Sequence, residues 1–103
     1  MDQYGQYHLW YGAHNSNLQY TYSTKPHNAA AWAAGTQITG TLTVCNAVIV
    51  NGTIYVFEQG TNSRLTYCTG TPSKSGGVSL WSSEVASRIS ARTPYGWLGN
   101  TVV

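Results

Sequence analysis

Short runs of β-branched and aromatic residues recur along the whole chain, separated by Gly, Asn, Ser and Pro. This pattern is typical of an all-β protein. It predicts strands near residues 6–12, 17–23, 30–34, 41–50, 53–59, 64–70, 78–83 and 95–103. Three short links have hairpin chemistry, because Asn tolerates left-handed backbone angles and Gly adopts them freely. They are Asn15-Ser16, Asn62-Ser63 and Asn51-Gly52, of which the last is the strongest signal.

The predicted strand at 53–59 is apolar on both of its faces. Ile54 and Val56 point to one side and Tyr55 and Phe57 to the other, because successive side chains of a strand alternate. A sheet without a polar face fits between two other sheets, as a blade of a β-propeller does. A two-layer sandwich more often shows an alternating polar face.

The chain contains an internal repeat. Residues 4–24 align with residues 51–71 after a shift of 47, and six of the 21 positions are identical. After the next loop, a shift of 49 places Trp32 on Trp81. Such units cannot bury their own faces alone, so they stack. We predict one propeller-forming domain, 1–103, made of repeats at about 4–50 and 51–99.

The end of the chain also matches an earlier segment. The shift of 49 carries residues 48–51 onto 97–100, where the chain reaches the point at which its own beginning would continue. We therefore expect residues 95–103 to form a strand that completes a blade with a neighbouring copy.

The alanine-rich stretch 28–34 is the one candidate helix in the sequence. Its counterpart in the second repeat is 76–80, which begins with two glycines and is a poor helix former. Because the repeat places the two segments in equivalent positions, we predict an extended conformation for both.

Two repeats are too few to close a propeller, which typically has four to eight blades. Rotationally related copies must then complete the ring. A trimer with six blades is our first expectation, and a tetramer with eight is the second. Monomers would expose apolar blade faces at both ends.

Charge is sparse, at 8% of residues with a formal net charge of +2, and the basic residues are scattered. Phosphate binding needs clustered Lys and Arg, so we expect no nucleic-acid partner. The sequence has no apolar run of about 18 residues, so we expect no membrane span. The opening residues do not have the pattern of a secretory signal, and we leave the localisation open. Cys45 and Cys68 fall on predicted strands that are not neighbours, which favours two free thiols.

Catalysis by paired carboxylates is not expected. The acidic residues are Asp2, Glu58 and Glu84, and Asp2 lies in a terminus that we expect to be frayed. A Ser-His-Asp arrangement would depend on the same three residues and lacks a nucleophile-elbow sequence. The three histidines have no metal-ligand spacing with Cys or acidic partners. We therefore expect a protein that is not an enzyme, with no catalytic residue, metal or cofactor.

The abundance of Tyr and Trp beside neutral polar residues favours carbohydrate binding. A sugar packs its C–H face on an aromatic ring, and its hydroxyls need hydrogen-bond donors and acceptors. The candidate ligand-binding residues are His8, Tyr20, Trp32, Tyr55, Glu58, Gln59, Tyr67, Trp81 and Trp97. The competing interpretation is a structural or protein-interaction ring whose aromatic side chains fill space between blades. For Glu58 alone, a solvated position at a blade rim is the simpler expectation.

The segment 52–67, followed by Trp81 and a strand containing Pro94, resembles a blade of bacterial and fungal β-propeller lectins. The layout is similar to the seven-bladed lectins of insect-pathogenic bacteria, and the two-repeat chain resembles the short fucose-binding lectins that trimerise into six-bladed rings. In the fucose-binding group an Arg, a Glu and a Trp hold the sugar between blades. The corresponding positions here hold His8 and Tyr55, Tyr20 and Tyr67, and Trp32 and Trp81. The resemblance implies a multivalent lectin for glycans or glycoconjugates, with between-blade pockets that lack the two charged residues.

Overall fold

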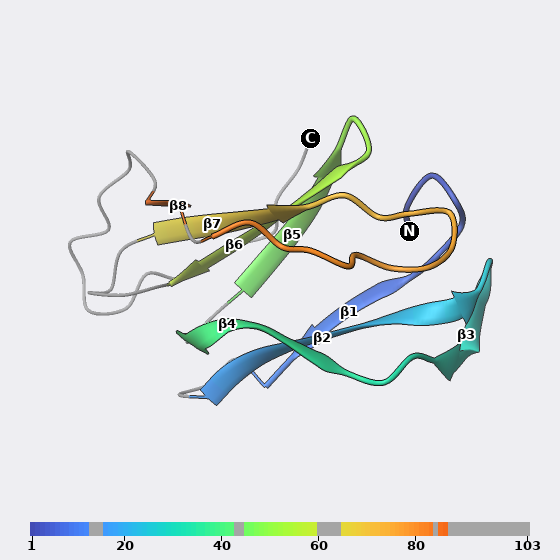
Figure 1. Cartoon of the computed structure of the whole chain (residues 1–103), viewed down its shortest axis with the longest axis horizontal. Helices are drawn as coiled ribbons and strands as arrows, with labels where there is room; N and C mark the ends of the chain where they lie inside the picture. The colour runs from blue at the N-terminus through green and yellow to red at the C-terminus, as the bar shows by residue number, and fades with distance from the viewer. Residues whose placement is uncertain (13–15, 43–44, 60–64, 84, 87–103) are drawn as a thin grey trace.

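The computed structural model describes residues 1–12, 16–42, 45–59, 65–83 and 85–86. These residues form an all-β structure (Figure 1). The strands are β1 (His8–Tyr11), β2 (Ser16–Lys25), β3 (Asn28–Trp32), β4 (Thr36–Leu42), β5 (Cys45–Val50), β6 (Thr53–Gln59), β7 (Leu65–Gly70) and β8 (Val85–Ala86). Over the described ranges, no helix has the length and hydrophobicity needed to cross a bilayer.

The strands form two antiparallel sheets. In the first sheet, β2 pairs with β1 on one edge and with β3 and β4 on the other. The second sheet has the simple order β5-β6-β7-β8. Figure 1 shows the two sheets packed face to face, with the connection from β7 to β8 running out beyond β7 and returning along the gap between them.

The pairing registers of the two sheets are related by the same two offsets as the sequence. Trp10 lies opposite Tyr20 in the first sheet, and Phe57 lies opposite Tyr67 in the second, each residue 47 positions later. The Ser23 pairing with Trp32 corresponds in the same way to the isolated bridge between Gly70 and Trp81, with an offset of 49 for the tryptophan. β1, β2 and β4 thus occupy the positions of β6, β7 and β8.

Two tight turns follow from local backbone chemistry. Asn51 and Gly52 join β5 to β6 with φ angles of 49° and 78°, so the predicted Asn-Gly hairpin is confirmed. Pro26 and His27 join β2 to β3, and His27 adopts a left-handed φ of 54°. The backbone N–H of His27 donates to the carbonyl of Gly5, which ties this turn to the N-terminal segment.

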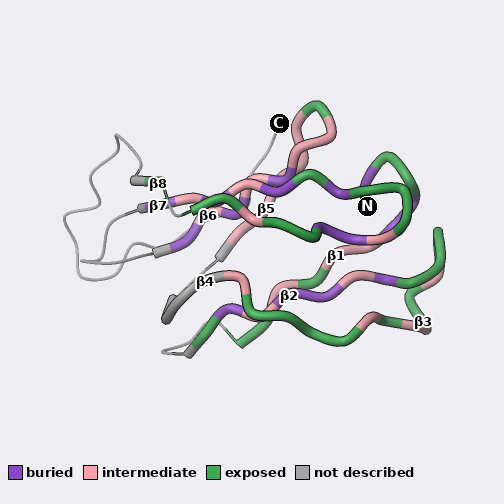
Figure 2. The backbone as a smooth tube through the Cα atoms, in the orientation of Figure 1, coloured by how far each residue is buried: buried purple, intermediate pink, exposed green. Residues whose placement is uncertain are grey.

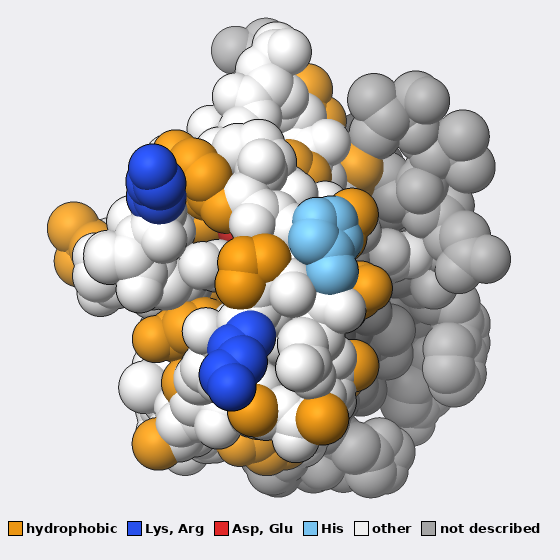
Figure 3. Space-filling model, turned by 90° about the vertical axis from the view of Figure 1, so that its right-hand side faces the viewer, with side chains coloured by type: hydrophobic (Ala, Val, Ile, Leu, Met, Phe, Trp, Pro, Cys, Tyr) orange, Lys and Arg blue, Asp and Glu red, His pale blue; other side chains and the backbone are white. Residues whose placement is uncertain are grey.

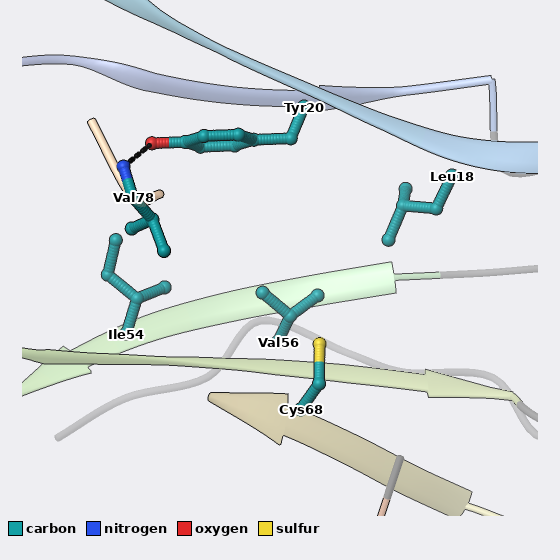
Figure 4. Close-up of a cluster of buried hydrophobic side chains, with 6 residues drawn as sticks. All are labelled: Leu18, Tyr20, Ile54, Val56, Cys68 and Val78. Atoms are coloured by element: carbon teal, nitrogen blue, oxygen red, sulfur yellow. Dashed lines mark hydrogen bonds between the residues drawn. The ribbon is translucent and has the colours of Figure 1, made fainter. Parts of the chain in front are cut away.

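The core lies between the sheets. Its buried side chains come from β2, β6, β7 and the long connection after β7: Leu18, Tyr20, Ile54, Val56, Cys68 and Val78. Figure 4 shows them converging on one space, and Figure 2 shows buried positions concentrated where the sheets face each other. Cys68 is buried in this core, and nothing is described of the Cys45 side chain, so the two free thiols stay a prediction.

The structure corrects two expected strands. The single strand predicted at 41–50 is wrong, because β4 covers Thr36–Leu42 and β5 covers Cys45–Val50. The strand predicted at 78–83 is also wrong, since only Trp81 makes a bridge there and pairing resumes at β8. The extended prediction for 28–34 is confirmed at β3. The hairpin links Asn15-Ser16 and Asn62-Ser63 and the strand 95–103 lie wholly or partly outside the described residues.

Candidate binding site beside Tyr20 and Trp81

A cavity of about 620 Å³ opens where the first sheet meets the segment after β7. The described part of its wall comes from β2, from the link between β3 and β4 with the start of β4, and from residues 76–81. Tyr20, Tyr22 and Trp81 supply aromatic surface. The neutral polar residues Thr36, Gln37 and Ser79 line the same space, and none of the described lining residues carries a charge.

Trp81 packs edge-on against Tyr20, with ring centroids 5.0 Å apart and planes at 80°. The bridge to Gly70 places Trp81, and the missing side chain of Gly70 makes room for it. A Cβ on Gly70 would lie 2.7 Å from Trp81 Cε3 and 2.5 Å from Val78 Cγ1. Trp10 completes the cluster, with its ring centroid 6.3 Å from that of Trp81 and 5.7 Å from that of Tyr20.

The hydroxyl of Tyr20 is held by a chain of hydrogen bonds. Asp2 Oδ2 and His8 Nε2 lie 2.8 Å apart, and His8 Nδ1 lies 2.8 Å from Tyr20 Oη. The backbone N–H of Val78 donates to Tyr20 Oη at 3.1 Å (Figure 4). A carboxylate only accepts, so the Nε2–H of a neutral His8 donates to Asp2 while its Nδ1 accepts from the Tyr20 hydroxyl. Every group in the chain is then satisfied.

Asp2 anchors this chain and is not frayed. Its side chain is 0% exposed, and its Oδ1 accepts from the backbone N–H groups of Tyr4 and Gln6 at 2.9 and 3.0 Å. Burial alone would raise the pKa of Asp2, but the hydrogen bonds from Gln6, His8 and Tyr4 outweigh burial and hold that pKa below 3.8. The expectation of a frayed terminus at Asp2 is therefore wrong, because the carboxylate accepts hydrogen bonds from three residues, Tyr4, Gln6 and His8.

Burial has opposite effects on the two other members of the chain. It lowers the pKa of His8 below 6.5, and this effect outweighs the opposing hydrogen bond and charge of Asp2. It raises the pKa of Tyr20 to about 12. A buried phenol that ionises so late and already accepts from Val78 is a poor nucleophile, so the Asp2–His8–Tyr20 chain positions the tyrosine ring beside the cavity.

Two indole N–H groups of the cluster are buried and have no acceptor among the described residues, those of Trp10 and Trp81. The loop after β7 is also tied to the N-terminal segment, since the Gly77 N–H donates to Gln6 Oε1 at 3.0 Å. Tyr22 lies across Gly76 and Gly77, and a Cβ on Gly77 would lie 2.3 Å from Tyr22 Cδ1. The aromatic cluster and the loop thus form one packed unit.

The structure separates the predicted site residues into groups. Tyr20 and Trp81 share the cavity, and His8 lies behind Tyr20, where it lines a smaller cavity of about 330 Å³. Trp32 is 38% exposed at the end of β3, and its Nε1–H donates to the Ala29 carbonyl. Tyr55 and Tyr67 contact each other at 6.1 Å on β6 and β7, away from this cavity.

The remaining predicted site residues do not reach the cavity or are not described. Glu58 is 0% exposed, so the solvated rim position expected for it is wrong. It lies on the face of β6 that carries Ile54 and Val56, opposite to Phe57. The Gln59 side chain and all of Trp97 lie outside the described residues.

Sequence reasoning missed Trp10, Tyr22 and Asp2 as parts of this site. Trp10 carried a signal, because it alternates with Leu9 on a predicted strand and aligns with Phe57 in the repeat. Asp2 precedes the first strand and gave no local signal. The face shown in Figure 3 has basic side chains that lie apart from one another among neutral and hydrophobic ones. Among the described residues, no group of His, Cys, Asp and Glu is arranged to hold a metal ion.

Comparisons of the chain with protein-family models, with curated proteins and with solved structures found no match.

Proposed function

We propose that the protein is a carbohydrate-binding lectin whose sites lie between adjacent blades of a β-propeller, completed as a ring by identical copies. The observation that carries the proposal is the cavity beside Tyr20 and Trp81, which combines aromatic rings with neutral hydrogen-bonding groups. A sugar needs both, since its C–H face packs on aromatic surface while its hydroxyls need donors and acceptors.

The size and charge of the cavity agree with such a ligand. Its volume of about 620 Å³ falls within the range of about 300–1,000 Å³ that is usual for small-molecule sites. The wall carries aromatic and aliphatic area beside the Thr36 hydroxyl and the Gln37 amide, without a charged side chain among the described residues. A neutral polyol is therefore favoured over an anionic ligand such as a phosphate ester.

The matched registers of the two sheets support the propeller part of the proposal. Each sheet places a tryptophan opposite the last part of an equivalent strand. Trp32 lies opposite Ser23 of β2, and Trp81 lies opposite Gly70 of β7. Two such units leave most of a ring open, so three copies giving six blades is the favoured assembly, followed by four copies giving eight. Several weak sites on one ring would gain avidity on a glycan-coated surface, by about 10² or more.

A second candidate function is a structural or protein-interaction ring without sugar binding. The burial of Tyr20, at 1% exposure, favours it, because a ring buried this far contributes to packing whether or not a ligand binds. Glycan-array binding with competition by a free monosaccharide separates the two functions. An array without binding supports the ring without sugar.

A matched pair of substitutions locates the site. Ala34 is exposed and lines the cavity, so Ala34→Arg fills the cavity and should reduce glycan binding at least about tenfold. Ala30 is an exposed alanine on β3 that does not line the cavity, so Ala30→Arg should leave binding unchanged. Equal binding by both variants would place the sugar elsewhere.

A further inference from the structure

Burial differs sharply between equivalent positions of the two repeats. Leu9 is 46% exposed, whereas Val56, 47 positions later, is 0% exposed. Tyr11 is 43% exposed, whereas its counterpart Glu58 is 0% exposed. The buried member of each pair faces the first sheet within the same chain. The exposed member lies on the face of the first sheet that points away from the core, which we call the outer face of the first sheet.

The second sheet shows the converse difference. Tyr20 is 1% exposed because Trp81 and Val78 cover it, whereas its counterpart Tyr67 is only half-buried. Tyr67 contacts Phe57 at 5.8 Å, on the side of β6 and β7 opposite to the core residues. We call this aromatic surface of Tyr55, Phe57 and Tyr67 the outer face of the second sheet. It corresponds by the offset of 47 to His8, Trp10 and Tyr20, of which Trp10 and Tyr20 contact Trp81 of the second repeat.

The chain already makes one contact between the inner face of its first sheet and the inner face of its second sheet. The two outer faces are equivalent to the two sides of that contact. Inside the chain, the Tyr20 face of the first sheet receives the Val56 face of the second sheet together with Trp81. The outer face of the second sheet, with Tyr67, corresponds to the Tyr20 face, and no sheet packs on it among the described residues. The outer face of the first sheet, with Leu9 and Trp32, corresponds to the Val56 face with Trp81.

We propose that the outer face of the first sheet binds the outer face of the second sheet of another copy, with Trp32 of one copy packed against Tyr67 of its neighbour. Trp32 has the place in its repeat that Trp81 has in the second, and at 38% exposure it presents apolar surface for such a contact. The two faces differ from each other, so the contact is heterologous and generates a ring when it is repeated. This inference rests on the ring of the proposed function and does not depend on sugar binding.

The test is the mass of the full-length chain and of two variants by sedimentation equilibrium. The wild type should have a mass of about three chains, and a mass of four chains would correspond to the eight-bladed ring. Leu9→Lys places a charge on one face and Tyr67→Lys on the other, and each variant alone should be a monomer because it keeps only one competent face. Leu80→Lys is the matched control, since Leu80 is apolar and 82% exposed but lies on neither face, and it should assemble like the wild type.

Mixing the two variants distinguishes a heterologous contact from a symmetric one. The Leu9→Lys chain keeps its Tyr67 face and the Tyr67→Lys chain keeps its Leu9 face, so an equimolar mixture should form a species of two chain masses. A mixture that stays monomeric, or a single variant that still assembles, would overturn the proposed contact. A wild type that is monomeric at all concentrations would overturn it as well.

A measurement on the wild type alone covers the case in which Tyr67→Lys does not fold. Hydrogen exchange at high and low protein concentration should show protection lost on dilution in β1 and in β6–β7 together. Protection lost in neither, or in only one of them, contradicts the proposal. A ring that forms by this contact yet binds no glycan would refute the lectin and leave the contact intact.

Discussion

The indole of Trp81 packs edge-on against the phenol ring of Tyr20, at a centroid distance of 5.0 Å and an interplanar angle of 80°. The two residues are not equivalent positions of the repeat. Tyr20 lies on β2 in the first repeat, whereas Trp81 of the second repeat forms the isolated bridge to Gly70. Their contact therefore joins one repeat to the next.

Removing the Tyr20 hydroxyl should destabilise the protein more than removing the hydroxyl of its half-buried counterpart, Tyr67. Tyr20→Phe leaves the Val78 N–H and His8 Nδ1 without their partner in a buried site, which should cost about 2 to 3 kcal/mol of unfolding free energy. Tyr67→Phe is the matched control at the half-buried counterpart and should cost less than about 0.5 kcal/mol. Urea titration of both variants measures the difference, and equal costs would exclude the hydrogen-bond chain as a stabilising feature.

Replacing Trp81 separates its packing from its N–H group. Trp81→Ala removes a half-buried ring and should cost about 2 to 3 kcal/mol, toward the lower end of large-to-small aromatic changes. Trp81→Phe keeps an aromatic ring and removes a buried N–H that has no acceptor among the described residues, so its cost should stay below about 1.5 kcal/mol. A Trp81→Phe cost as large as that of Trp81→Ala would show that the indole N–H has a necessary partner.

Two glycines with positive φ should respond very differently to alanine. At Gly77, φ is +61° and a Cβ would lie 2.3 Å from Tyr22 Cδ1, so strain and overpacking together should cost at least about 3 kcal/mol. At Gly52, φ is +78° but the nearest atom is the flexible amide end of Gln3 at 3.1 Å, so Gly52→Ala should cost about 1 to 2 kcal/mol of backbone strain. Thermal unfolding of the two variants gives the comparison, and the reverse order would contradict the position of Tyr22.

Stability should fall on acidification in two stages. The folded state lowers the pKa of His8 below 6.5, so the unfolded state binds more protons once the pH drops below about 6.5, and the free energy of unfolding decreases. The pKa of Asp2 is also lowered, so a second decrease should begin as the pH falls below about 3.8. His8→Gln should flatten the first stage only. Urea midpoints between pH 8 and pH 3 measure both stages, and a profile that is flat from pH 7 to pH 5 in the wild type would contradict the burial of His8.

The all-β class, the Asn51-Gly52 hairpin and the extended segment at β3 could be predicted because each has a strong local signal. The division between β4 and β5 could not, since residues 42–45 contain no Gly, Pro or Asn to mark a break. The bridge at Trp81 replaced the predicted strand because the glycines at 76 and 77 hold the preceding loop against Tyr22. Local periodicity carries no information on such a contact between distant segments.

For the site, sequence reasoning identified Tyr20, Trp81 and His8 as candidates but not how they meet. Their proximity depends on how one sheet packs on the other, which the spacing of residues does not reveal. The sequence near Asp2 gives no indication of burial and favours a frayed terminus, yet the Asp2 carboxylate accepts two backbone N–H groups and pairs with His8. The acidic side chain of Glu58 favours a surface position, because acidic residues are rarely buried, whereas the alternation along β6 directs it toward the core.

The most direct test of the account is the mass of the unmodified chain in solution, measured by sedimentation equilibrium over a wide concentration range. Two repeats with one exposed half-contact at each end predict a closed assembly of about three chain masses at the upper concentrations. A single chain mass throughout that range would contradict both the ring and the contact between Trp32 and Tyr67.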